Sequence, residues 1–346
     1  MQPIFDGHND TLISSHHEQL VEGSAEGHID LPRMRRGGMR GGLFAVFVES
    51  PGGGLRVSDP GGTLREDGSV AWPEMAPVEF LPAAAQAAKV AGRLFALERD
   101  GHLKVARTIA DVDSARAGDG PPVAVLHIEG AEPIDPGLET LDFWYAAGLR
   151  SIGPVWSRSN AFGHGVPFVF PSSPDTGPGL TEAGIALVLR CAELGIAVDL
   201  SHLNEAGFWD VARLDPGPLV ASHSGAHALA GTSRNLTDAQ LDAIGASGGL
   251  VGIVYATPFL RSDFANDPNT DLRLIAEHAR YIADRIGVAH VALGSDFDGA
   301  VIPAGLGDVS GLPRLLAALA EVGFSAAEID DIAWNNWRRV LAVWWR

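Results

Sequence analysis

Short apolar runs recur along the chain between longer stretches with helical spacing. The runs are rich in aliphatic and β-branched residues and are apolar on both faces. Such runs, separated by helices, are typical of buried parallel strands. We predict eight strands, at residues 4–7, 43–49, 123–128, 150–155, 196–201, 218–222, 249–255 and 290–295.

The segments between these runs carry readable helix signals. Thr181 is a suitable N-cap for a helix that stops at Gly195. Residues 272–286 place apolar side chains on one helical face. Ser325 and Glu328 have the spacing of a capping box, which predicts a helix in the C-terminal tail.

Eight alternating strand and helix units predict an α/β fold, a closed (β/α)8 TIM barrel. We expect a single domain over residues 1–346, because no linker or internal repeat divides the chain. Two segments rich in Gly, Pro, Ser and Asp, at 50–76 and 157–180, are predicted to be long loops at the C-terminal face of the barrel. Catalytic groups of such barrels gather at that face.

Metal-capable side chains follow the predicted strands. They are His8 and Asp10 after the first strand, Glu129 after the third, His202 after the fifth, His223 after the sixth, and Asp296 and Asp298 after the eighth. Residues two apart in a strand point to the same side, so one ion could contact both His8 and Asp10. One barrel mouth would therefore hold three histidines and up to four carboxylates.

This donor set indicates a catalytic site with two metal ions. The only cysteine is Cys191, which excludes a thiolate site, and imidazole with carboxylate suits zinc. Three histidines and several carboxylates exceed the needs of one tetrahedral ion, and a carboxylate such as Glu129 could bridge two ions. Two bridged ions can hold a hydroxide at neutral pH and polarise a carbonyl, which predicts hydrolysis of an amide, ester or phosphate.

The excess of acidic residues over basic residues excludes some classes of binding partner. There are 43 Asp and Glu against 25 Lys and Arg, a formal net charge of −18. Nucleic acids and anionic membranes attract clustered basic residues, so we expect neither as a partner. No apolar stretch reaches the roughly 18 residues of a membrane span. No export signal precedes His8, so we expect a cytoplasmic protein with a small-molecule substrate, and a homodimer is left open.

Three other catalytic or metal-binding motifs are absent or stand in the wrong structural context. Gly245-Ala-Ser247-Gly-Gly249 has the G-x-S-x-G spacing of serine hydrolases, but it precedes a strand instead of following one, and no P-loop is present. His227 lies four residues after His223 without the glutamate of a helical zinc motif, and we leave it outside the site. The remaining histidines without a partner at a strand end are expected at the surface or in the core: His16, His17, His28, His102, His127, His278 and His290. For His127 a supporting position beside the site is the alternative.

Six short motifs are spread in order over nearly the whole chain. They are Asp6-Gly-His8-Asn-Asp10, Ile128-Glu129-Gly130, Asp199-Leu-Ser-His202, Ser222-His223-Ser224, Ser233-Arg234-Asn235 and Asp296-Phe-Asp298-Gly299. Together they resemble the motifs of the renal (membrane) dipeptidase family, whose members are zinc-dependent enzymes built on a (β/α)8 barrel. The resemblance implies that His8 and Asp10 bind one zinc ion, that His202 and His223 bind a second, and that Glu129 bridges the two.

The resemblance also implies roles in substrate binding. Asp296 would contact the substrate amine and pass a proton to the leaving nitrogen. Arg234 would pair with the free C-terminal carboxylate of a dipeptide, because a guanidinium can donate two hydrogen bonds to it. The family places a histidine near the substrate carbonyl, where this chain has Trp156. We predict that Trp156 and Tyr255 contact the substrate, and the hypotheses for the missing oxyanion donor are Arg158, Asn160 and His164.

The sequence therefore predicts a zinc-dependent dipeptidase with two zinc ions per chain, acting on a small dipeptide with a C-terminal D-residue as an open option. The first alternative is another barrel metallohydrolase, acting on a cyclic amide, lactone or phosphoester. Such sites usually begin with His-x-His and use a lysine bridge, in contrast to His8-x-Asp10 and Glu129. The second alternative is a catalytically silent relative that binds a metal or a peptide.

Overall fold

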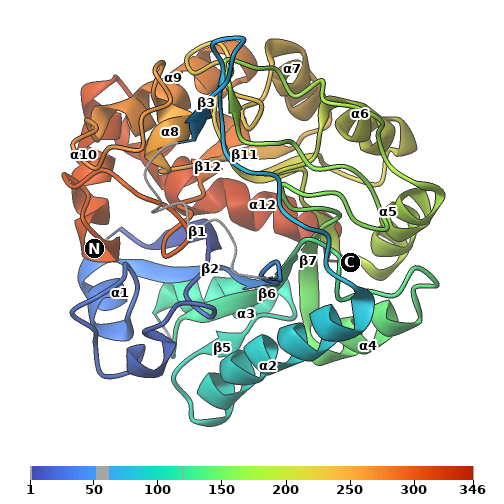
Figure 1. The fold of residues 1–346 in the computed structure, drawn as a ribbon. Coiled ribbons are helices and arrows are strands. Elements are labelled where there is room, and N and C mark those ends of the chain that lie inside the picture. Colours follow the sequence, from blue (N-terminus) through green and yellow to red (C-terminus); the bar gives the residue numbers. More distant parts are fainter. Residues whose placement is uncertain (1, 52–61, 119, 346) are drawn as a thin grey trace.

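Parallel strands lie where the apolar runs predict them (Figure 1). The computed structural model describes residues 2–51, 62–118 and 120–345. The strands at the eight predicted positions are β1 (Ile4–Asn9), β2 (Met39–Phe47), β6 (Val123–Glu129), β7 (Leu149–Gly153), β9 (Ala197–Val198), β10 (Val220–Ser224), β11 (Leu250–Ile253) and β12 (Val291–Leu293). Nearly every residue in them is buried, as expected of strands covered on both faces.

These strands form two curled parallel sheets that are linked at both edges. The larger sheet has the order β1-β2-β6-β7-β9, and the smaller has the order β10-β11-β12. One isolated parallel bridge, between Asp199 and Val220, links the end of β9 to β10. Another, between Asn9 and Phe297, links β1 to the segment after β12. The fold is mixed α/β, and its parallel strands place their carboxyl ends along one edge.

Helices surround the two sheets in Figure 1. The described α-helices are α1 (Leu31–Gly37), α2 (Phe80–Arg99), α3 (Ile109–Ala117), α4 (Glu139–Ala147), α5 (Glu182–Leu194), α6 (Glu205–Leu214), α7 (Asp238–Ala246), α8 (Thr257–Leu260), α9 (Arg273–Ile286), α10 (Leu312–Glu321), α11 (Ala326–Asp330) and α12 (Asn336–Trp344). The predicted caps are confirmed. The Thr181 side chain accepts a hydrogen bond from Gly184 N, and Gly195 ends α5 with a φ of 74°. Ser325 and Glu328 make both hydrogen bonds of a capping box before α11.

The two segments predicted as loops contain short strands that pair with one another. β3 (Thr63–Leu64), β4 (Val70–Ala71) and β8 (Val169–Phe170) form an antiparallel sheet with β4 in the middle. Residues 52–61 of the first segment lie outside the described residues. A further strand, β5 (Lys104–Val105), pairs with β6. The prediction of long loops at 50–76 and 157–180 was wrong where β3, β4 and β8 lie, because strands of two residues leave no periodic pattern.

The main hydrophobic core includes side chains from β1 through α12. Trp337 of α12 donates a hydrogen bond from Nε1 to the carbonyl oxygen of Leu293 at 2.9 Å. Gly7 lies against this ring, and an added Cβ would be 2.5 Å from both Trp337 and the carbonyl oxygen of Ser222. The C-terminal helix therefore fixes β1 one residue before His8.

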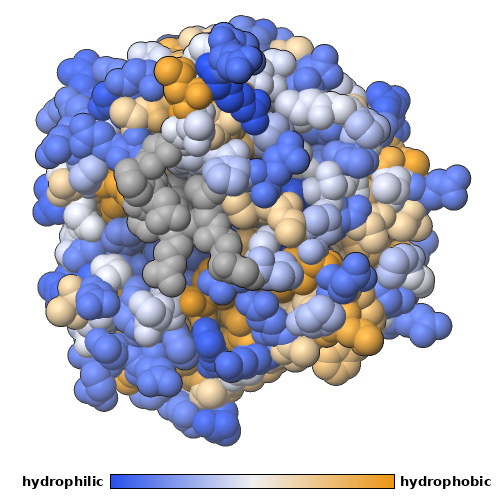
Figure 2. Space-filling view, in the orientation of Figure 1, coloured by the Kyte–Doolittle hydropathy of each residue, from blue (hydrophilic) through white to orange (hydrophobic). Residues whose placement is uncertain are grey.

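One face of the molecule is mainly hydrophilic, with hydrophobic residues in separate patches (Figure 2). Single exposed apolar residues are normal on proteins. Within the described ranges, no helix has both the length and the apolar composition that a membrane crossing requires.

Candidate metal centre

β1 brings the first two predicted ligands to the carboxyl edge of the larger sheet. His8 lies in the strand and Asp10 follows it, and both side chains are buried. His8 Nε2 is 3.8 Å from Asp10 Oδ2. The alternation of the strand thus turns both side chains toward the same place, as predicted.

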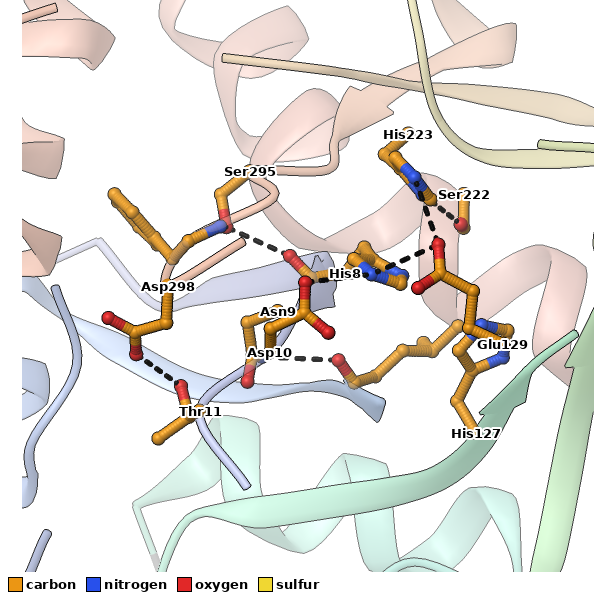
Figure 3. Close-up of polar contacts among 12 residues, drawn as sticks. His8, Asn9, Asp10, Thr11, His127, Glu129, Ser222, His223, Ser295 and Asp298 are labelled. Carbon is orange, nitrogen blue, oxygen red and sulfur yellow. Dashed lines mark hydrogen bonds and ion pairs between the residues drawn. The ribbon is translucent and has the colours of Figure 1, made fainter. Parts of the chain in front are cut away.

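Glu129, the last residue of β6, lies among the predicted ligands. Its Oε1 atom is 3.6 Å from His8 Nε2, 3.0 Å from His202 Nε2 and 3.4 Å from His223 Nε2. The Nε2 atoms of His202 and His223 are 3.0 Å apart. In Figure 3 the Glu129 carboxylate is joined by dashed lines to His8 and His223, which come from different sheets. The structure therefore gathers all five predicted ligands in one place.

These side chains form two donor groups that share Glu129. His8, Asp10 and Glu129 offer ligand atoms within 4.8 Å of one another, and so do Glu129, His202 and His223. Both ring nitrogens of His8 and Oδ1 of Asp10 are buried without a hydrogen-bond partner among the described residues. Unpartnered buried polar atoms are costly, so their concentration here fits metal ligation. Imidazole and carboxylate donors without a thiolate fit zinc.

Burial and neighbouring charges perturb the ionisation of these groups. Burial raises the pKa of Glu129 well above its usual value, although the nearby His8 opposes the shift. Burial also disfavours the charged form of His8, but Glu129 and Asp10 outweigh it and raise the pKa of His8 to about 10. Burial holds the pKa values of His202 and His223 well below the usual range, so both rings are neutral, the form that binds metals.

The backbone after two strands adopts a conformation that non-glycine residues seldom take. His202 after β9 has a φ of 67°, and Asp296 and Asp298 after β12 have φ values of 60° and 67°. A left-handed residue of this kind costs about 1–3 kcal/mol and is typical of functional sites. The tight turns aim His202 and Asp296 toward the donor groups.

Asp296 belongs to the same site. Its backbone N donates to the carbonyl oxygen of His8 at 3.0 Å, and its carboxylate forms a third donor group with His8 and His223. Burial, followed by the charge of Asp10, raises the pKa of Asp296 to about 6. A carboxyl group that titrates in this range can carry a proton near neutral pH.

Arg234 is buried beside the donor groups without an ion-pair partner in the described part of the chain. Its Nη2 lies 3.2 Å from His202 Nε2 and donates to the carbonyl oxygen of His223 at 3.2 Å, while Nε has no partner. Its guanidinium lies 5.3 Å from the centre of the Phe259 ring. Burial lowers the pKa of Arg234 to about 10, so the group stays charged at neutral pH. A buried cation with free donors suits an anionic ligand.

Aromatic side chains cover one side of the site. The Trp156 ring lies 5.6 Å from the ring of His202 and 5.5 Å from that of Phe168. This aromatic cluster contains Trp72, Trp156, Phe168, Val254, Ala256, Phe259, Phe264 and Ala300. Val70 and Phe170 of the short antiparallel sheet pack against this cluster. Tyr255 lies instead in the main core, with its ring 5.5 Å from Phe297, and its contact with substrate stays a prediction.

The three hypothetical oxyanion donors lie in different surroundings. Arg158 is fully buried and its nitrogens donate to Glu132, Ser50 and the Val48 carbonyl. Asn160 donates to the carbonyl oxygen of Pro154 and accepts from Phe162 N. Asn160 and His164 are both partly exposed, and His164 Nδ1 lies 3.0 Å from Ser159 Oγ. The side chains of Arg158 and Asn160 are therefore occupied by hydrogen bonds within and between loops.

Two histidines have a partner that the sequence did not indicate. His16 Nε2 is 3.4 Å and His28 Nδ1 is 3.6 Å from Asp298 Oδ1. Asp298 also accepts a hydrogen bond from Thr11 Oγ1 at 2.9 Å, as Figure 3 shows. The expectation that His16 and His28 lack a partner at a strand end was therefore wrong. Their contact spans most of the chain and has no local pattern. Asp298 belongs to none of the donor groups found in the described structure.

Two serines that support the histidines, Ser157 and Ser222, were not identified as supporting residues from the sequence. Ser157 Oγ lies 2.7 Å from His202 Nδ1, and Ser222 Oγ lies 2.8 Å from His223 Nδ1. His127 is buried on β6, with Nδ1 3.0 Å from Ser151 Oγ, and its ring lies 5.4 Å from that of His8. Serine has no distinctive spacing, so only the motifs around His202 and His223 could have drawn attention to it. His227 binds the carbonyl oxygen of Ser172 and is in none of the donor groups of the described residues.

Residues 1–343 match the family profile described as Membrane dipeptidase (Peptidase family M19). The chain belongs to the membrane dipeptidase family. A metallopeptidase of Rhodobacter sphaeroides, solved with a phosphinate mimic of the dipeptide L-Ala-D-Ala, is 44% identical with a TM-score of 0.91, and the match covers 98% of each chain. A structure described as dipeptidase AC is 45% identical with a TM-score of 0.91, covering 99% of this chain and 98% of its own.

The chain is also similar in sequence to further bacterial proteins. A protein in the pqqA 5′ region of Klebsiella pneumoniae is 48% identical over 246 residues, which cover 71% of this chain and 90% of that protein. The resemblance inferred from the six motifs is confirmed. As a membrane dipeptidase family member with metallo-dipeptidase neighbours, the chain is a hydrolase of the dipeptidase class.

Proposed function

We propose that this family member is a dipeptidase with two zinc ions, one held by His8 and Asp10 and the other by His202 and His223. Glu129 would bridge them. The observation that supports this proposal best is the position of Glu129 Oε1 within 3.0–3.6 Å of the Nε2 atoms of all three histidines. When bound, a pair of zinc ions supplies a hydroxide at neutral pH and polarises the peptide carbonyl.

The other residues of the site bind the two ends of the dipeptide. Arg234 receives the C-terminal carboxylate, because its guanidinium is buried, charged and without an ion-pair partner among the described residues. Asp296 binds the N-terminal ammonium and passes a proton to the leaving nitrogen, for which its raised pKa suits it. Trp156 and its aromatic neighbours exclude water from this side and strengthen these charged contacts.

A dipeptide with an L-residue followed by a D-residue is the proposed substrate type. The Rhodobacter sphaeroides metallopeptidase, which was solved with a phosphinate mimic of L-Ala-D-Ala, is 44% identical to this chain. A buried site whose aromatic wall includes Trp156 and Phe168 favours small side chains in the substrate.

We also infer that the eight parallel strands close into one (β/α)8 barrel within a single domain. The two isolated bridges, Asp199 to Val220 and Asn9 to Phe297, support closure because they join both pairs of sheet edges. A cytoplasmic location and a homodimer stay predictions from the sequence.

Metal analysis and a dipeptide panel test the proposal. The purified protein should hold close to two zinc ions per chain and should cleave some members of a set of L,L, L,D and D,L dipeptides. Removal of zinc by a chelator should abolish the activity, and zinc should restore it. Glu129→Gln should lower the zinc content, whereas Glu98→Gln, which changes a partly exposed ion pair with Arg107, should not. One tightly held ion with full activity would refute the bridged pair, and silence of the zinc-loaded protein on every dipeptide would favour another substrate.

A further inference from the structure

Asp199 is a buried carboxylate that the proposed mechanism does not use. It follows β9, and its backbone N donates to the carbonyl oxygen of Ile152 on β7 at 2.8 Å. Its Oδ1 accepts hydrogen bonds from Ser222 N at 2.8 Å and Ser201 N at 3.0 Å. Its Oδ2 accepts one from Ser222 Oγ at 2.5 Å. Asp199 therefore binds both the backbone and the hydroxyl of the residue that precedes His223.

The direction of these hydrogen bonds fixes a proton on His223. The Ser222 hydroxyl donates to Asp199 Oδ2, so its single proton points at Asp199. Ser222 Oγ can then only accept from His223 Nδ1, 2.8 Å away. Nδ1 of His223 must carry the ring proton, and the lone pair on Nε2 faces Glu129 at 3.4 Å. A metal ion needs that lone pair.

Asp199 also lies close to His8 and His127. Its Oδ2 is 3.7 Å from His127 Nε2, and the His127 ring meets the ring of His8 edge-on, with centroids 5.4 Å apart. His8, His127 and Asp199 offer polar atoms that all lie within 4.8 Å of one another. The His8 Nδ1 and His127 Nε2 atoms are buried and have no hydrogen-bond partner among the described residues. The Asp199 carboxylate therefore lies near His8 and also reaches His223 through Ser222.

We propose that Asp199 is a positioning residue that acts through Ser222 to fix the tautomer and orientation of His223, so that Nε2 is presented to the metal centre. Residues that bind the outer nitrogen of a metal-ligating histidine typically contribute 10–100-fold to metal affinity. The chain of contacts from carboxylate to hydroxyl to imidazole links the turn after β9, which holds His202, with β10, which holds His223. This inference rests on the proposed zinc ligation by His223.

Zinc affinity measured by competition with a chelator tests the proposal. In Asp199→Asn the amide can donate to Ser222 Oγ, which turns the hydroxyl proton toward His223 Nδ1 and moves the ring proton to Nε2. We expect one of the two zinc ions to bind roughly 10–100-fold more weakly. Ser222→Ala removes only a hydroxyl and should give a loss of the same order. Both changes interrupt the same path from Asp199 through Ser222 to His223. The zinc affinity of the double variant should therefore lie within about twofold of that of the single variant with the lower zinc affinity.

A matched substitution separates positioning from general stability. Asp30 is another buried carboxylate, which caps α1 by accepting from Arg33 N at 2.7 Å. Asp30→Asn should lower the unfolding temperature and leave zinc affinity unchanged. If Asp199→Asn does not fold, Ser222→Ala carries the test.

The outcomes distinguish this inference from the proposed function. A wild-type protein that binds no zinc refutes the proposed function. A wild-type protein with two zinc ions, together with variants that bind zinc as tightly, refutes the role of Asp199 alone. That role is also refuted if the effects of Asp199→Asn and Ser222→Ala multiply in the double variant, or if Asp30→Asn weakens zinc binding equally.

Discussion

Replacing Arg234 with methionine should make the protein more stable and the enzyme much weaker. Arg234 is only 4% exposed and forms no ion pair with the described residues. Burial lowers its pKa from the ordinary arginine value to about 10. At 1.36 kcal/mol for each pKa unit, holding the charge in the folded protein costs about 3 kcal/mol. This cost is present in full below pH 10 and disappears as the pH rises above the folded-state pKa.

Methionine is apolar and of similar length, so it removes this cost while it also removes favourable contacts. The contact with the Phe259 ring and the hydrogen bond to the His223 carbonyl contribute about 1 kcal/mol each. The free energy of unfolding of Arg234→Met should therefore increase by about 1 kcal/mol. Urea unfolding at a fixed free zinc concentration measures this change, because bound metal would otherwise shift the equilibrium.

The kinetic effect should be opposite in sign and larger. Loss of one partner of a buried, hydrogen-bonded charge pair costs about 2–5 kcal/mol. This corresponds to a decrease of about 30-fold to 5000-fold in kcat/KM for a free dipeptide. Dipeptides with an amidated C-terminus lack the carboxylate and should lose far less.

Arg285→Met is the control, because Arg285 pairs with Asp238 and Asp242 at the surface and should change little in either assay. An Arg234→Met variant that is less stable than the wild type would contradict the energetic reasoning. Equal losses on the free and amidated dipeptides would contradict the assignment of Arg234 to the carboxylate.

Two further substitutions test other parts of the structure. Asp296→Asn should lower kcat by several orders of magnitude while the two proposed zinc ions stay bound, as measured by steady-state kinetics and metal analysis; unchanged turnover would rule out its role in proton transfer. Gly7→Ala should lower the free energy of unfolding by about 1–3 kcal/mol, because the new methyl group would lie 2.5 Å from Trp337 and the Ser222 carbonyl. Gly92→Ala on α2, where nothing lies within 4 Å of the added carbon, should instead leave stability equal or higher by up to about 1 kcal/mol. Equal effects of the two alanines would show that close packing at Gly7 is unimportant.

Local patterns were enough to predict the strands and the gathering of the ligands. Each apolar run indicates a buried strand, and the carboxyl ends of parallel strands share an edge, so His8, Glu129 and His223 could be brought together without a structure. What could not be predicted depends on contacts between distant loops. The pairing of β4 with β8 is one such contact, and the enclosure of Arg158 by Glu132 and Val48 is another.

The direction of individual side chains also could not be predicted from the sequence. The turn at His202 has a φ of 67°, which no spacing rule for strands anticipates. The position of Tyr255 illustrates the same limit, because the end of a strand can point into the core as easily as toward the mouth. The partners of the outer histidine nitrogens, Ser157 and Ser222, are small residues whose role depends entirely on geometry.

The hydrogen bond from Asp296 N to the carbonyl oxygen of His8 and the bridge between Asn9 and Phe297 join the first strand to a segment near the end of the chain. A ribosome releases the five proposed metal ligands, of which His223 is the last, before it releases Asp296, so the emerging chain has no complete active site until almost all of it has been synthesised. Contacts between such distant residues also slow folding. A growing chain could therefore carry all the proposed metal ligands and still lack Asp296, so active enzyme would form only once the chain is nearly finished.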